Sequence, residues 1–95
     1  MKSEILKELR EAVNEWARIH NVALTSVEAK YSGIGSNVHV LVVAKQGFEN
    51  WRWSERDGSL FDFLYAKVAN NSKVFISRLE TMTEEEYEKY EEVPA

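Results

Sequence analysis

Residues 38–45, VHVLVVAK, constrain the fold most, because nearly every position is apolar. A strand with one face in water alternates apolar and polar residues. A run like this one is instead typical of a strand that is covered on both faces or lies centrally in a sheet. The rest of the chain must therefore supply partner strands and covering elements.

The segment before this run predicts its first partner. Residues 22–31 are rich in β-branched residues and alternate, which places Val27, Ala29 and Tyr31 on one side of a strand. The turn-forming sequence SGIGSN follows at residues 32–37. Two strands joined across this glycine loop predict an antiparallel hairpin.

Both ends of the chain predict further elements. Residues 4–20 predict an amphipathic helix, because apolar residues recur at steps of three and four over about four turns. Val74 to Glu80 predicts a strand, and Thr83-Glu84-Glu85-Glu86 is a capping box that starts an acidic helix over residues 83–92. Residues 93–95 are expected to fray. The positions that form the apolar face of the first helix are Ile5, Leu9, Ala12, Trp16 and Ile19.

Residues 48–64, FENWRWSERDGSLFDFL, admit two interpretations. In the first, Ser54 or Asp57 caps a helix over about 55–69 whose inner face carries apolar residues four apart. In the second, Asp57-Gly58 is the two-residue turn of a hairpin that pairs residues 51–53 with residues 61–65. Gly58 costs a helix about 1 kcal/mol, but the apolar spacing favours the helix.

Composition restricts the classes of function. The 95 residues, 44% hydrophobic and 29% charged, fit a single globular domain over residues 1–95. The longest apolar run, Val40 to Ala44, is far shorter than a membrane span, so we expect a cytoplasmic protein without membrane contact. The absence of cysteine excludes disulfides, thiolate metal sites and cysteine nucleophiles.

The net charge of −4 is concentrated near the C-terminus. Residues 81–95 hold six of the sixteen acids and one of the twelve bases, which leaves residues 1–80 with ten acids and eleven bases. The body of the domain is therefore nearly neutral. Nucleic-acid binding is possible with this charge but is not favoured.

Several motifs resemble the BolA family, whose fold is similar to one class of KH domain. Phe48-Glu49, Glu55-Arg56 and Leu64 resemble that family's turn and the start of its second helix. The stretch VFISRLETMTEEEY resembles its last strand and ending, through Val74, Thr81, Thr83, Glu85, Glu86 and Tyr87. The resemblance implies an α+β fold in the order α-β-β-α-β-α, with helices packed on a small antiparallel or mixed three-stranded sheet.

The chain departs from the family where function is concerned. The family typically has His-Arg after Glu-Arg, where this chain has Asp57-Gly58. Members that share an iron–sulfur cluster with monothiol glutaredoxins use a histidine after the last strand's valine and a second ligand in the first hairpin loop. Here these positions are Phe75 and the loop SGIGSN. The comparison therefore implies the scaffold without a cofactor.

Ionisable residues give little support for catalysis or metal binding. His20 and His39 are the only histidines, and we interpret them as a helix C-terminal residue and a sheet-face residue. Glu55, Asp57 and Asp62 are close in sequence, but acids near a helix start ordinarily interact with its free N–H groups. We expect no enzyme, no catalytic residue and no metal.

Trp51, Arg52 and Trp53 are the strongest candidates for an interaction surface. On an extended segment the two indoles share one face, and aromatic residues with arginine are enriched at interface anchors. The opposing interpretation is that at least one tryptophan covers the edge of the core. Four bases could add a basic rim: Arg56, Lys67, Lys73 and Arg78.

These features predict a small regulatory or adaptor domain that acts by binding another protein. The alternatives are a KH-like nucleic-acid-binding regulator and an iron–sulfur trafficking partner of a monothiol glutaredoxin. The sequence identifies neither the partner nor the oligomeric state.

Overall fold

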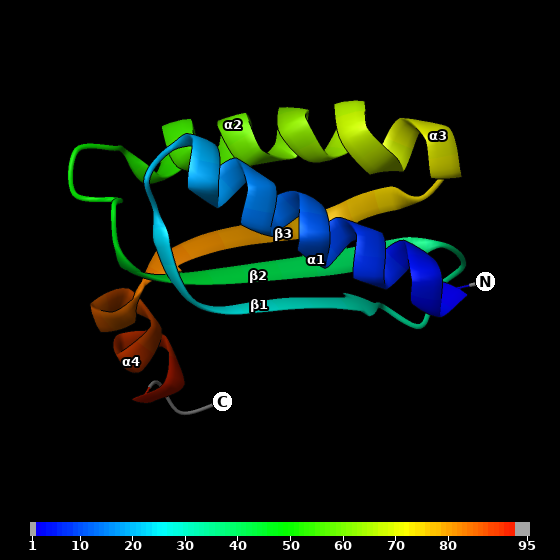
Figure 1. The fold of residues 1–95 in the computed structure, drawn as a ribbon. Helices are drawn as coiled ribbons and strands as arrows, with labels where there is room; N and C mark the ends of the chain where they lie inside the picture. Colours follow the sequence, from blue (N-terminus) through cyan, green and yellow to red (C-terminus); the bar gives the residue numbers. More distant parts are fainter. Residues whose placement is uncertain (1, 93–95) are drawn as a thin grey trace.

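The computed structural model describes residues 2–92 and confirms the predicted order of elements (Figure 1). Helix α2, the π-helical turn η1 and helix α3 follow one another without a break and form one long helical segment. The expected fraying of residues 93–95 lies outside the described residues. The bounds are α1 Lys2–Ile19, β1 Ala23–Tyr31, β2 Asn37–Gln46, α2 Trp53–Leu64, η1 Tyr65–Ala69, α3 Asn70–Ser72, β3 Phe75–Thr83 and α4 Glu84–Glu92.

The apolar run forms the central strand of a mixed three-stranded sheet. Strand β2 pairs antiparallel with β1 and parallel with β3, so the sheet order is β1-β2-β3. Helices α1 and α2 cover one face, and α4 lies at one end of the opposite face (Figure 1). Val42 faces the helices α1 and α2, whereas Val43 lies on the opposite face of the strand and is also buried. This two-sided burial explains why the central strand does not alternate.

The core lies between the sheet and the helices. Leu9, Val13 and Trp16 of α1 are fully buried, and the Trp16 indole N–H donates to the Ser59 hydroxyl at 3.0 Å. Ile19 is an exception to the predicted apolar face, because 59% of its surface is exposed at the end of the helix. The core side chains below α1 are Val38, Val40 and Val42 of β2, and those beside it are Leu60 and Leu64 of α2.

Residues 53–64 are helical, so the hairpin interpretation about Gly58 is wrong. The predicted caps are also wrong, because α2 begins at Trp53 with Arg52 at the N-cap position. The Glu55 carboxylate accepts the Arg52 backbone N–H at 2.9 Å, which replaces a cap by Ser54 or Asp57. Gly58 lies inside the helix, where an added Cβ would meet no atom within 4 Å.

The capping box of the last helix is confirmed. The Glu86 N–H donates to the Thr83 hydroxyl at 3.1 Å, and the Thr83 N–H donates to the Glu86 carboxylate at 2.9 Å. Strand β3 continues to Thr83, three residues beyond the predicted end at Glu80. The strand therefore leads directly into α4, and this junction ties the two elements together.

Candidate functional site

A groove runs between α2 and the edge of β3. Trp53, Asp57, Phe61 and Tyr65 recur every four residues and so lie along one face of the helical segment. Two hollows, of about 310 and 340 Å³, adjoin at Asp57 on this side of the helix. We call this the Trp53 groove; it is lined by Trp53, Arg56, Asp57, Gly58 and Phe61 of α2, by Ile76, Ser77, Arg78, Leu79, Glu80, Thr81 and Met82 of β3, and by Glu86 of α4.

The edge of β3 is closed at two points by side chains from the helical segment. The Tyr65 hydroxyl accepts the Ile76 N–H at 2.9 Å, and the Asp57 carboxylate accepts the Thr81 N–H at 3.1 Å. Residues 77–80 lie between these points, on a strand whose only partner among the described strands is β2. An unpaired strand edge presents backbone N–H and C=O groups, so this stretch can accept an additional extended chain.

A buried polar cluster forms the floor of the groove. Arg56 is only 4% exposed. Its Nε donates to the Thr81 hydroxyl at 2.9 Å, and its terminal nitrogen donates to the Thr81 carbonyl at 3.0 Å and pairs with the Glu86 carboxylate. The guanidinium lies 4.8 Å from the centre of the Phe48 ring, and the Thr81 hydroxyl also bonds Asp57. This set, which we call the Arg56 network, joins α2, β3 and α4.

The two carboxylates of the network have opposite pKa shifts. Burial raises the pKa of Asp57 above its ordinary value of 3.8, although hydrogen bonds from Thr81 and the charge of Arg56 act in the opposite direction. Burial also acts to raise the pKa of Glu86, but hydrogen bonds from Thr83 and the charge of Arg56 outweigh it, and the pKa falls below 4.5.

These shifts have opposite consequences for stability. Folding favours the protonated form of Asp57, so its contribution is present below the unfolded pKa and is lost as pH rises through the raised folded pKa. Folding favours the ionised form of Glu86, so its contribution is present above the unfolded pKa and is lost as pH falls through the lowered folded pKa. The pH dependence of the two residues therefore distinguishes them.

The structure separates the three residues predicted to form an aromatic surface. Trp53 is 67% exposed, and Arg52 is exposed beside it. Trp51 is half-buried instead, with its ring edge-on to Trp16 at 5.8 Å and to His20 at 5.0 Å between ring centres. One tryptophan thus covers the edge of the core, and the other projects into water.

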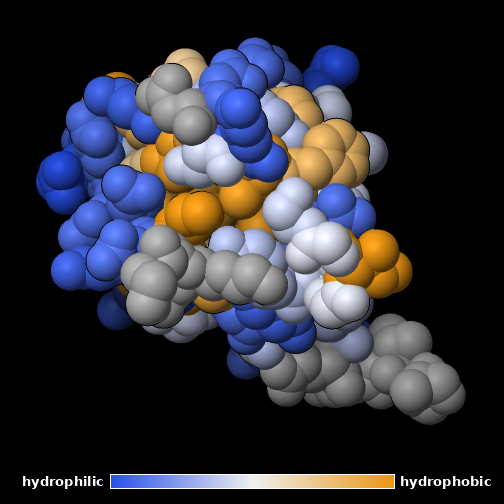
Figure 2. Space-filling view, turned by 90° about the vertical axis from the view of Figure 1, so that its right-hand side faces the viewer, coloured by the Kyte–Doolittle hydropathy of each residue, from blue (hydrophilic) through white to orange (hydrophobic). Residues whose placement is uncertain are grey.

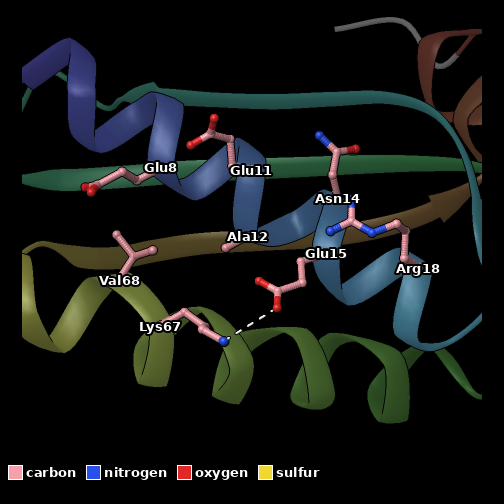
Figure 3. A pocket seen from close by; sticks show the side chains of 8 residues that line it. All are labelled: Glu8, Glu11, Ala12, Asn14, Glu15, Arg18, Lys67 and Val68. Carbon is pink, nitrogen blue, oxygen red and sulfur yellow. Dashed lines mark ion pairs between the residues drawn. The ribbon is translucent and has the colours of Figure 1, made fainter.

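The predicted basic rim is not continuous. Arg56 is buried in the network, so its assignment to the surface is wrong. Lys67 belongs to η1 and points toward α1, where its ammonium group is 3.5 Å from the Glu15 carboxylate (Figure 3). Lys73 is exposed at the far end of the helical segment, about 30 Å from Trp53 at 1.5 Å per residue. These lysines therefore do not belong to the same surface as Trp53.

The first hairpin loop and the start of β3 adjoin at the opposite end of the molecule. The Phe75 N–H donates to the Ser36 carbonyl at 3.3 Å. Ile34 and Phe75 are 72% and 57% exposed. Figure 2 views this end, and hydrophobic residues gather in the middle of the face. Phe75 stands where the resembled family has its histidine ligand, and the loop at residues 32–37, where that family has its second ligand, contains no histidine or cysteine.

Comparisons with protein-family models, characterised proteins and solved structures found no match to this chain. Within residues 2–92, no helix is both long and apolar enough to span a membrane. Among the side chains that the structure describes, no three of His, Cys, Asp or Glu converge as a possible metal site. The geometry of the described residues therefore has to support any functional assignment.

Sequence reasoning named Trp53 as a candidate for an interaction surface but missed the groove beside it. Phe61, which is partly exposed, was expected to belong either to a helix or to a hairpin strand. The spacing of four from Trp53 through Asp57 to Tyr65 was present in the sequence. It becomes informative only once the helix is known to begin at Trp53, because only then do these positions share a face.

Proposed function

We propose that this chain is a non-enzymatic, BolA-like adaptor domain that binds another protein through the Trp53 groove. The observation that carries the proposal is the 67% exposure of Trp53 at the entrance of a groove beside a free strand edge. Large exposed aromatic residues are frequent anchors of protein interfaces. The strand edge can add backbone hydrogen bonds to an extended segment.

The charges around the groove indicate the chemistry of the partner. Asp57, Glu80 and Glu86 line the part nearest Trp53, and Arg56 is the single base among its lining residues. Arg56 pairs with Glu86, and Arg78 of the adjoining hollow pairs with Glu80, which leaves the Asp57 carboxylate outside these two ion pairs. The surface therefore favours a partner segment that places an apolar side chain against Trp53 and a lysine or arginine close to it.

The same charges weaken the nucleic-acid alternative at this site. A phosphate backbone next to these carboxylates would be repelled. Arg52 and Arg78 lie closer to the groove than Lys67 and Lys73, but Arg78 is paired with Glu80. Iron–sulfur trafficking has less support at the other end, since Phe75 replaces the histidine of the resembled family and the loop SGIGSN contains no histidine or cysteine. Protein binding remains the function that the geometry supports best.

A peptide-display selection tests this proposal. The purified domain is used to select peptides from a random library, and the affinities of the selected peptides are measured for wild type, Trp53→Ala and Phe61→Ala. Ile34→Ala is the matched control, because Ile34 is equally apolar and exposed but lies at the other end. We expect basic, apolar-containing peptides whose affinity falls by about 10-fold or more with Trp53→Ala and is unchanged with the control.

Two results would contradict the proposal. One is a failure to select any peptide, and the other is equal binding by Trp53→Ala and wild type. Titration with single-stranded RNA and DNA tests the main alternative. Tight binding that weakens steeply between low and moderate salt would favour a nucleic-acid-binding function instead.

A further inference from the structure

The sheet face opposite α1 and α2 carries its charges in two rows that run across all three strands. Lys30 pairs with His39 and His39 with Arg78, which gives one row whose charged residues are both basic. The second row on this face lies two residues away along each strand. In it Glu28 pairs with Leu41 and Leu41 with Glu80, so its charged residues are both acidic. We call these six residues the charged face: Glu28, Lys30, His39, Leu41, Arg78 and Glu80.

These residues are accessible and lie together. Four of the six belong to the edge strands β1 and β3, and His39 and Leu41 belong to the central strand β2. All six line one hollow of about 260 Å³ that Tyr87 and Tyr90 of α4 border. Within the chain the rows neutralise each other, since Lys30 lies 3.4 Å from Glu28 and Arg78 lies 2.6 Å from Glu80. All four ion-pair members keep solvent exposure, from 29% for the Glu80 side chain to 64% for that of Lys30.

Two parallel rows of opposite sign are self-complementary. A two-fold axis that lies in the face and runs between the rows places the basic row of one copy over the acidic row of the other. The rotation keeps each strand above its own counterpart, so Lys30 meets Glu28 of the second copy and Arg78 meets Glu80 of the second copy. His39 then faces the apolar Leu41, and no like charges oppose each other across the interface.

We propose that the charged face is a homodimer interface and that its occupant is a second copy of this chain. The occupant follows from charge complementarity, because the pattern matches itself under two-fold rotation. Helix α4 borders the face at one end only, and the rotation places the α4 of each copy at opposite ends, where they flank the two sheets (Figure 1). Four intermolecular ion pairs form from the two symmetric sets of contacts.

The size of the face sets the expected strength of the dimer. An axis between the rows lets the strands overlap over residues 27–31, 37–43 and 75–83, which at about 3.3 Å per residue and about 4.8 Å between strands gives a flat area of roughly 330 Å² per copy. Twice this area is below the roughly 1,200 Å² of standard specific interfaces, so the dimer should be weak and dependent on concentration. Sedimentation should therefore be followed from micromolar to about millimolar protein.

Charge reversal tests the proposal. Lys30→Glu/Arg78→Glu makes the whole face acidic, and Glu28→Lys/Glu80→Lys makes it basic. Each variant alone should lose dimerisation, with a dissociation constant raised about 10-fold or more. An equimolar mixture of the two variants should form a heterodimer that weakens with salt, because only opposite faces then attract. Circular dichroism confirms that each variant is folded.

Lys7→Glu/Arg10→Glu is the matched control for Lys30→Glu/Arg78→Glu. It makes the same change in net charge, but on α1, on the other side of the sheet. It should leave the wild-type dissociation constant unchanged. The proposal is overturned if wild type remains monomeric at about millimolar concentration. It is also overturned if either reversed variant dimerises as wild type does, or if the mixture of the two fails to associate.

Discussion

Replacing Arg56 with methionine tests whether the Arg56 network stabilises the fold. Methionine keeps most of the apolar stem but removes the guanidinium, with its two hydrogen bonds to Thr81 and its pairing with Glu86. Hydrogen bonds from a charged group contribute about 1.5–3 kcal/mol each, and breaking a buried charged network costs about 3–5 kcal/mol. We therefore expect a loss of about 3 kcal/mol.

That loss is a large fraction of the stability of a domain of this size, which should be about 5–14 kcal/mol. The midpoint of thermal unfolding should fall by about 12–24 °C, and urea denaturation followed by circular dichroism gives the free energy. Glu86→Gln should cost only about 1 kcal/mol, because the Glu86 side chain is 49% exposed and water screens its charge.

Arg52→Met is the matched control, since Arg52 is the neighbouring exposed arginine and its replacement should change stability by less than about 0.5 kcal/mol. Arg56→Lys keeps the charge but not the planar fork, so its loss should lie between those of Arg52→Met and Arg56→Met. A loss below about 1 kcal/mol for Arg56→Met would refute the reasoning, because the network would then contribute no more than an exposed ion pair.

Two further pairs of substitutions give predictions of opposite sign. Gly58→Ala should stabilise the protein by about 0.5–1 kcal/mol in urea denaturation, because the added Cβ has open space within a helix. Gly47→Ala should destabilise it by more than about 1 kcal/mol, since φ is +112° and the Cβ would lie 2.7 Å from a backbone carbon; equal effects would contradict both. Urea denaturation from about pH 3 to about pH 7 tests the two carboxylates. As pH rises, the free energy of unfolding contains a loss from Asp57 that Asp57→Asn should abolish, and a gain from Glu86 that Glu86→Gln should abolish. Unchanged pH profiles would show that neither shift is coupled to folding.

The sequence predicted the order of elements because its strongest patterns are set by burial. The unbroken apolar run had to be the central strand, and the stripe of residues four apart in α2 outweighed Gly58. The π-helical turn at residues 65–69 had no such signal. It extends the helical segment beyond α2, and the hydrogen bond from Ile76 to Tyr65, at the start of this turn, depends on tertiary contacts that no local pattern encodes.

The exposed residues were harder to predict because the backbone becomes helical between the two tryptophans. Trp51 and Trp53 would share a face on a strand, but the helix begins at Trp53. Trp51 therefore turns toward Trp16, and Trp53 projects outward. The helix begins at Trp53, two residues before the predicted start at about residue 55, and this difference decides which aromatic residue a partner can reach.

The resemblance to the BolA family rests on residues that hold the scaffold together. Phe48 is buried beneath Arg56, Glu49 accepts the Gly47 N–H, and Glu55 accepts the Arg52 N–H. Four other residues that carry the resemblance also form hydrogen bonds or ion pairs: Arg56, Thr81, Thr83 and Glu86. Such contacts constrain how helix and strand join, whatever the domain binds. They can persist while exposed positions change, which is why a sequence of this kind predicts its architecture more readily than its partner.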